Sequence, residues 1–236
     1  MDSAELKNRV RELRAEGRSP KEIARTLGVS PSVVAPLVRA VAAEGSAAAA
    51  GEPEVAGCWI NVGWSTGLTI DSARDWTDEK PSADGLDGRV SVLVARRHTW
   101  DRMTVCGYLA DVYCTGVKDL IGPDIIDDRQ LSRFREYFFS DYAGWQEAPI
   151  ELAQHLVFGA VDYARTMGLE PFVTFDSASH VLGTWEGGSS AITFGRDGKP
   201  FYVPGPNDES GKIVRTLEHK LGKSGFDYVL GQSPAS

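Results

Sequence analysis

One stretch of the chain, residues 149–167, combines carboxylate and imidazole side chains at helical spacing. A helix would place Glu151, His155 and Asp162 along one stripe, because they lie four and then seven residues apart. A carboxylate and an imidazole four residues apart can bind a metal or orient a general base. Asp162 would lie about 10.5 Å beyond His155 on a straight helix, too far to share the same ligand. Glu151 and His155 are therefore candidate catalytic residues, and a polar helix face with one half-buried histidine is the alternative.

A second acid–base candidate lies where an apolar run ends. Residues 110–119 read ADVYCTGVKD, and strand ends beside a glycine turn often build functional sites. Asp111 and Lys118 could form an acid–base or ion-pair couple there. The alternative is that Asp111 only marks the point at which one face of the strand reaches solvent.

Several chemistry-bearing motifs are absent. We expect no GxSxG or HExxH motif, P-loop, Rossmann glycine fingerprint or EF-hand loop to carry the chemistry of this chain. Its three cysteines, Cys58, Cys106 and Cys114, are widely spaced and form no CxxC pair. We expect no metal site, no cofactor and no disulfide framework, with Cys106 and Cys114 serving as small buried hydrophobes.

The pattern of the first 44 residues predicts three short helices. Residues 4–16 carry leucine and valine at helical spacing. Residues 19–22 read SPKE, which indicates an N-cap serine, a proline at the first helical position and a capping-box glutamate. We expect this second helix to end at Gly28 and a third helix to begin at Ser30-Pro31.

Residues 20–39 resemble the bacterial helix-turn-helix family, in particular its resolvase-like and homeodomain-like modules. The match rests on Ala24 in one helix, Gly28 in the turn and Val34 in the next helix. A small residue lets the two helices approach, glycine permits the tight turn, and the aliphatic side chains close a small core. The resemblance implies a DNA-binding module over residues 1–44.

The third helix would be the DNA reader, and its outward positions are polar but weakly basic. They include Ser30, Ser32 and Arg39, which we take as the candidate DNA-binding residues. Among them, only Arg39 has a side chain favoured for contacts with base edges. Pro36 lies within this helix and removes an amide donor. A generic three-helix bundle and a protein-docking module are the alternatives to DNA binding.

Charge is divided unevenly along the chain. Residues 1–44 carry eight basic and six acidic side chains, a net charge of +2, whereas the whole chain is at −8 and the remainder is therefore at −10. Because an acidic surface repels phosphates, we expect any DNA contact to fall to the N-terminal module. No run approaches the roughly 18 apolar residues of a spanning helix, and no secretory pattern begins the chain, so we expect a cytoplasmic protein with no membrane partner.

Two domains are predicted. Residues 45–54 read GSAAAAGEPE, which indicates a linker between the helix-turn-helix domain of residues 1–44 and a larger domain of residues 55–236. Clustered strands favour the α+β class for the larger domain, with an antiparallel sheet and several helices. Its expected elements are a strand at 58–62, a long mobile loop at 63–87, a hairpin of 89–97 with 103–113, helices at 130–142, 149–167 and 175–182, a hairpin of 190–194 with 201–203, a helix capped by Asn207 and ending at Leu221, and a strand at 226–230.

The segments HLVFGAVDYARTMGLEP and ITFGRDGKPFYVPGP of the larger domain resemble only uncharacterised bacterial proteins, which supply no function. The leading hypothesis is a DNA-associated transcription regulator. Its helix-turn-helix would bind DNA as a homodimer, and its second domain would dimerise or sense an effector. The alternatives are an enzyme, hydrolase or nuclease-like, that its helix-turn-helix localises, and a helix-turn-helix that docks on a protein partner.

Overall fold

The computed structural model of the 236-residue chain describes residues 9–10, 12–13, 18–30, 34, 37–38, 52–79, 88–185, 187 and 190–229. The chain divides into two compact units, Met1–Pro53 and Glu54–Ser236. Most of the predicted linker, residues 45–51, lies outside the described residues. No helix in the described part of the chain is both long and apolar enough to cross a membrane.

In the first unit, α2 (Pro20–Leu27) begins and ends where its sequence predicts. The Ser19 hydroxyl accepts the Glu22 N–H, and the Glu22 carboxylate accepts the Ser19 N–H at 2.8 Å, which confirms the capping box. Gly28 follows with a φ of 66°, in the left-handed region. A Cβ at Gly28 would have nothing within 4 Å, so glycine is needed here for its backbone dihedral and not for space.

A small apolar core surrounds α2. Its buried members are Val10, Leu13, Ile23, Ala24 and Val34. The described residues of the two flanking segments, 9–10, 12–13, 34 and 37–38, are helical. Two of the three positions that carry the helix-turn-helix resemblance, Ala24 and Val34, are therefore packed in one core.

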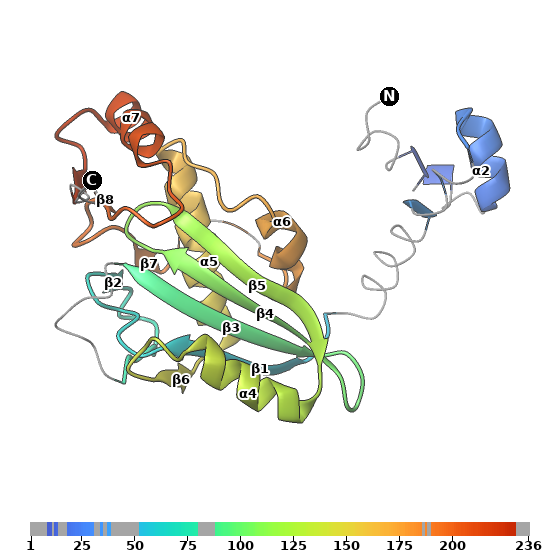
Figure 1. Ribbon diagram of the computed structural model, residues 1–236, viewed down its shortest axis with the longest axis horizontal. Coiled ribbons are helices and arrows are strands. Elements are labelled where there is room, and N and C mark those ends of the chain that lie inside the picture. Colours follow the sequence, from blue (N-terminus) through green and yellow to red (C-terminus); the bar gives the residue numbers. More distant parts are fainter. Residues whose placement is uncertain are drawn as a thin grey trace, which may run out of the picture. The chain divides into compact units, whose positions relative to one another are not determined.

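The second unit is built on a five-stranded sheet of order β5-β4-β3-β1-β6, in which every neighbouring pair is antiparallel (Figure 1). The predicted hairpin is confirmed, with Arg89 opposite Asp111 and Arg97 opposite Met103. The unit is thus of mixed α and β structure with an antiparallel sheet, as expected. Its strands are β1 (Val55–Asn61), β3 (Arg89–Arg97), β4 (Met103–Asp111), β5 (Gly116–Ile126) and β6 (Trp145–Glu147).

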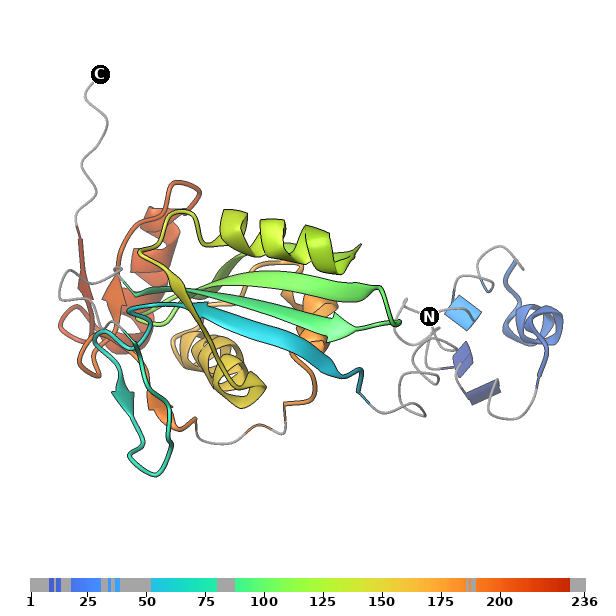
Figure 2. The ribbon, with the colours of Figure 1, turned by 90° about the horizontal axis from the view of Figure 1, so that it is seen from below.

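Helices cover both faces of this sheet (Figure 2). The helix α5 (Ile150–Thr166) packs on one face, and α4 (Asp128–Phe138) packs on the other. We call them the α5 face and the α4 face. Side chains of β4 alternate between them: Tyr108 belongs to the core under α5, and Val105 belongs to the core under α4.

The remaining elements lie around the sheet. The short α6 (Phe175–Ala178) and the 3₁₀ turn Ser179–Val181 are anchored from β4 and β3: the Tyr108 hydroxyl donates to the Ala178 carbonyl at 2.8 Å, and Arg96 donates to the Val181 carbonyl at 2.6 Å. The others are α7 (Ser210–Leu221), β2 (Thr69–Ile70), β7 (Ile192–Thr193), β8 (Phe201–Tyr202) and β9 (Asp227–Tyr228).

The strand β5 is not predicted from the sequence. Its 11 residues, GVKDLIGPDII, contain Gly122-Pro123 and two aspartates, which are unfavourable in a central strand. At the edge of a sheet one side of the strand needs no ladder, so a proline is tolerated there. The same residues hinder further pairing along that edge.

The predicted hairpin of residues 190–194 with 201–203 is wrong. The strand β7 pairs with β2, and β8 pairs in parallel with β9. Only the expected turn is confirmed, with left-handed Asp197 and Gly198 and one bridge between Arg196 and Lys199. The Asp-Gly signal determines a local reversal of the chain, whereas packing against the rest of the unit selects the strand partners.

The predicted mobile loop of residues 63–87 is ordered over its described part, residues 63–79. It contains β2, and the Asp78 carboxylate accepts the N–H groups of Gly63 and Ser65 at 2.8 and 3.0 Å. The sequence signal for a loop came from its acidic residues, yet one of them ties the segment down.

Candidate functional site

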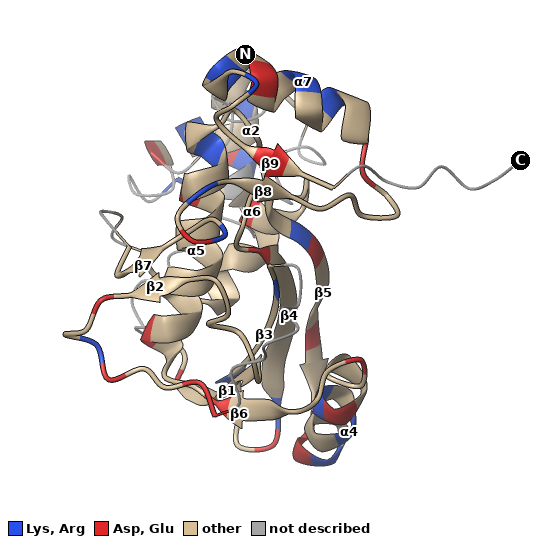
Figure 3. Cartoon of the chain, turned by 90° about the vertical axis from the view of Figure 1, so that its left-hand side faces the viewer, with Lys and Arg blue, Asp and Glu red and all other residues tan. Residues whose placement is uncertain are grey.

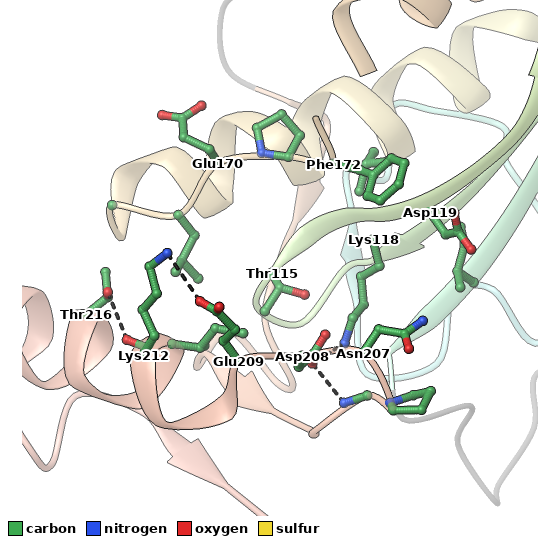
Figure 4. A pocket seen from close by; sticks show the side chains of 18 residues that line it. Thr115, Lys118, Asp119, Glu170, Phe172, Asn207, Asp208, Glu209, Lys212 and Thr216 are labelled. Atoms are coloured by element: carbon green, nitrogen blue, oxygen red, sulfur yellow. Dashed lines mark hydrogen bonds and ion pairs between the residues drawn. The ribbon is translucent and has the colours of Figure 1, made fainter. Parts of the chain in front are cut away.

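A cleft of about 700 Å³ opens beside the turn that joins β4 to β5 (Figure 4). Three segments wall it: residues 109–119 of the sheet, residues 168–172 after α5, and residues 205–216, which include the first turns of α7. We call it the β5–α7 cleft. Its volume is within the range of small-molecule binding sites, and its walls mix apolar and charged side chains, as ligand sites do.

An ion pair between Lys118 and Asp208 joins two walls of this cleft. Lys118 Nζ lies 2.7 Å from Asp208 Oδ2, and the two side chains are only 16% and 13% exposed. Asp208 also accepts the Gly205 N–H at 2.8 Å and the Tyr202 hydroxyl at 3.1 Å. Figure 4 shows the Lys118 side chain reaching from β5 toward Asp208 and Asn207. The pair therefore links β5 to the segment that precedes α7.

Asp208 is held in its charged form. Burial acts to raise the pKa of this carboxyl, but the hydrogen bonds from Lys118 and the Gly205 N–H outweigh it and lower the pKa below the ordinary aspartate value. The carboxylate is thus ionised at neutral pH. Its contact with Lys118 is a charge-assisted hydrogen bond.

Lys118 forms its ion pair with Asp208 and none with Asp111 among the described residues, although the charge of Lys118 acts to lower the pKa of Asp111. Asp111 is 3% exposed, which also excludes the alternative that it marks a solvent-facing strand end. Its carboxylate accepts the N–H groups of Tyr113, Cys114 and Thr115 at 2.9, 3.1 and 3.0 Å and the Thr115 hydroxyl at 2.7 Å. Burial raises the pKa of Asp111, while these donors act to lower it. The side chain organises its own turn, and Lys118 is directed to Asp208.

Glu151 and His155 lie on α5 as predicted, but each has its own partner. Glu151 Oε1 lies 2.6 Å from the guanidinium of Arg74 in a partly exposed ion pair. His155 is 7% exposed, and its Nδ1 accepts the Ala191 N–H at 3.1 Å. The Ser190 hydroxyl is also 3.1 Å from the same nitrogen. Glu151 thus binds the segment that contains Arg74, and His155 binds the segment that contains Ala191.

The His155 ring is enclosed by aromatic side chains. Its centroid lies 5.1 Å from that of Trp76 and 5.0 Å from that of Trp185. Burial and then the charge of Arg74 lower the pKa of His155, although Glu151 opposes them. With Nδ1 accepting a backbone N–H, the neutral ring carries its proton on Nε2. The alternative interpretation, a polar helix face with one half-buried histidine, is therefore wrong in its burial, because His155 is buried among aromatic rings and its Nδ1 is hydrogen-bonded.

The part of the chain that the structure describes contains no candidate metal site and no reactive thiol. No group of three or more His, Cys, Asp or Glu side chains there could hold a metal ion. All three cysteines are free and buried, which confirms the prediction for Cys106 and Cys114. Burial raises the pKa of Cys58 to about 12 and that of Cys106 to about 11, so neither is a thiolate at neutral pH.

The expectation that the chain has no GxSxG motif is wrong as to sequence, since residues 63–67, GWSTG, match this pattern of a hydrolase nucleophile. In those enzymes the serine stands on a sharp turn between a strand and a helix. Here the strand β1 leads through turns to β2, and the Ser65 hydroxyl donates to Asp78 Oδ2 at 2.9 Å. This serine anchors the 63–79 loop instead.

The residue that sequence reasoning misses is Asp208. Its segment, PGPND, predicts only an interruption of secondary structure before a helix. The expected Asn207 cap of α7 is also wrong, since the helix begins after Glu209. No local signal marks Asp208, because its partner Lys118 lies 90 residues earlier in the chain.

The candidate DNA-binding residues are placed only in part. Ser30 is exposed and follows the left-handed turn at Gly28. Ser32 and Arg39 lie outside the described residues.

Comparison of the chain with protein-family models, with curated proteins and with solved structures finds no match.

Proposed function

We propose that this chain is a cytoplasmic, DNA-associated regulatory protein. Its first unit binds duplex DNA through a helix-turn-helix, and its second unit receives a small-molecule effector in the β5–α7 cleft. The observation that carries the proposal is the burial of Ala24 and Val34 in one core on either side of the left-handed Gly28. A helix-turn-helix needs this combination of a close helix approach, a tight turn and a shared apolar core.

Charge supports the assignment of DNA to the first unit. Residues 1–44 carry a net +2, and the rest of the chain carries −10. A single module with so small a charge neutralises few phosphates, so binding requires a homodimer that places two modules on successive turns of the duplex.

The contacts of the former catalytic candidates favour a regulator over an enzyme. Asp111, Glu151 and His155 each hold backbone or loop partners, and none of the three lines the β5–α7 cleft; the fourth candidate, Lys118, lines it but is paired with Asp208. The β5–α7 cleft, by contrast, is walled by three segments that are distant in sequence. A ligand bound there would contact all three segments, as an effector that alters a fold must do.

The test is a titration of the full chain with duplex DNA at several salt concentrations. We expect measurable binding at low salt that weakens steeply as salt rises. Arg39→Ala should cost about 1–3 kcal/mol of binding free energy, and loss of a phosphate contact would flatten the salt slope by about one unit. Arg215→Ala, which removes an exposed arginine of α7, is the matched control and should leave binding unchanged.

Two results would contradict the proposal. Absence of DNA binding at low salt would favour a module that docks on a protein partner. Equal losses in the Arg39 and Arg215 variants would place the DNA contact outside the N-terminal module.

A further inference from the structure

Carboxylates outnumber amines in the β5–α7 cleft. Its charged lining residues are Asp119, Glu170, Asp208 and Glu209 against Lys118 and Lys212. The lining therefore carries a net charge of −2. Figure 3 shows acidic positions along β5, the strand that forms one wall.

Each lysine of the cleft has a carboxylate partner within it, but only the Lys118 pair is largely buried. The side chains of the Lys212–Glu209 pair are 74% and 76% exposed, so solvent screens that contact. Lys118 pairs with Asp208 at 2.7 Å, and Lys212 pairs with Glu209 at 3.3 Å across the start of α7. Figure 4 shows the Lys212 side chain lying over Glu209. An anionic ligand that recruited Lys118 would leave the largely buried Asp208 without its cation, which is costly. The buried lysine of the cleft, Lys118, is therefore unavailable to an anion, and the net charge of the lining also opposes one.

The other two carboxylates are more available. Glu170 pairs with Arg165 at 3.2 Å, but this contact is exposed and solvent screens it. Asp119 forms no ion pair within the described part of the chain, and its Oδ1 accepts only the N–H of the following residue, Leu120, at 2.8 Å. Asp119 can thus offer carboxylate lone pairs to a ligand without breaking an existing ion pair.

Apolar side chains form the rest of the cleft. Leu109, Val117 and Ile213 line it, and Phe172, from the segment after α5, is 39% exposed. An exposed aromatic ring can contact both an apolar body and a nearby cation, because the face of the ring is electronegative.

A smaller hollow of about 170 Å³ adjoins the cleft. Leu109 and Asp119 line both, and the smaller hollow adds Asp141, Phe138 and Tyr142. Asp119 therefore stands between two recesses that each combine a carboxylate with aromatic side chains.

We propose that the β5–α7 cleft binds an amphipathic organic cation, in which an ammonium group is attached to an apolar body. The ammonium lies against Asp119, and the apolar body covers Leu109 and Phe172. This inference rests on the proposed role of the cleft as the effector site and names the chemical class of the effector.

The test uses two probes that share one apolar body and differ in charge: phenylbutylamine and phenylbutyrate. Each is titrated calorimetrically into the full chain without DNA. The amine should bind about tenfold more tightly than the carboxylate, because the amine is attracted to Asp119 while the carboxylate is repelled by the net negative lining, and tenfold corresponds to about 1.4 kcal/mol for the two effects together. Tighter binding of phenylbutyrate, or no binding of either probe, would overturn the inference.

Variants locate the two halves of the ligand. Asp119→Asn should weaken phenylbutylamine by about two- to fivefold and leave phenylbutyrate unchanged or slightly tighter, because only the ammonium uses this exposed carboxylate. Phe172→Ala should weaken both probes alike. Glu136→Gln, which neutralises an exposed carboxylate of α4 outside both hollows, is the control and should change neither. Equal amine affinity in the wild type and Asp119→Asn would also overturn the inference.

The DNA titration separates this inference from the proposed function. If the chain binds DNA but not phenylbutylamine, the cation inference alone fails. If the chain binds phenylbutylamine but no DNA at low salt, the regulator fails and the cation site stands.

Discussion

The α5 face of the sheet and the β5–α7 cleft are built in opposite ways. On the α5 face, fully buried side chains of the helix and the strands, such as Leu156, Val92 and Tyr108, belong to one core. In the cleft, the walls meet through polar contacts, of which the Lys118–Asp208 pair is the most buried.

This difference indicates which part of the second unit is open to a ligand. Close packing of apolar side chains leaves no space, so the α5 face is a stabilising region. Ion pairs and turn hydrogen bonds hold segments at a distance and leave a hollow with directed polar groups. The following predictions test whether stability and ligand access are divided in this way.

The largest effect is expected on the α5 face. Leu156 is 0% exposed, and Leu156→Ala removes its packing and leaves a cavity. We expect a loss of about 2–5 kcal/mol in the free energy of unfolding, measured by urea denaturation. A loss below about 1 kcal/mol would mean that the α5 face is loosely packed and that the comparison fails.

A smaller loss is expected at the turn below the cleft. Asp111→Ala removes the acceptor of four hydrogen bonds and leaves the buried N–H groups of Tyr113, Cys114 and Thr115 without it. We expect the free energy of unfolding to fall by about 3 kcal/mol, since each unsatisfied buried donor is costly. Asp119→Asn, on the exposed side of the same hairpin, is the control. A neutral result for Asp111→Ala would show that water replaces the carboxylate at no cost.

The ion pair of the cleft should contribute less. Lys118→Met leaves Asp208 without its cation and should cost about 1–3 kcal/mol, whereas Lys199→Met, in an exposed pair with Asp227, should cost less than about 1 kcal/mol. Equal losses in the two variants would show that the Lys118 pair behaves as a surface pair.

The contribution of this pair should depend on pH. The pKa of Asp208 is lowered in the folded state, so its stabilising effect is complete above the unfolded value of about 3.9 and is lost as the pH falls below it. The difference in stability between the wild type and Lys118→Met should therefore shrink as the pH falls below about 4, through the lowered pKa of Asp208. A difference that stays constant as the pH falls would contradict the pairing.

The smallest effect is expected at His155. Its pKa is lowered in the folded state, so the unfolded chain binds the proton more readily, and stability should fall as the pH drops through about 6.5. Denaturation at pH 7 and pH 5 should show a smaller loss in His155→Gln than in the wild type. His98→Gln, at an exposed position, should behave as the wild type does.

The elements that could be predicted from the sequence are those whose signals lie in neighbouring residues. The SPKE capping box and Gly28 determined both ends of α2, because each contact joins residues at most a few positions apart. The β-rich runs at residues 89–97 and 103–113 predicted the β3–β4 hairpin. A long amphipathic run predicted α5 within one residue at each end.

Contacts between segments that are distant in sequence could not be predicted and are seen only in the tertiary structure. It turned β5 into an edge strand despite its proline, paired β7 with β2, and directed Lys118 to Asp208 and not to Asp111. These pairings depend on which surfaces stay exposed once α5 has packed on the sheet. No short stretch of neighbouring residues contains that information. The candidate site consists almost wholly of such contacts, whereas the individual helices and the central hairpin need only their own residues.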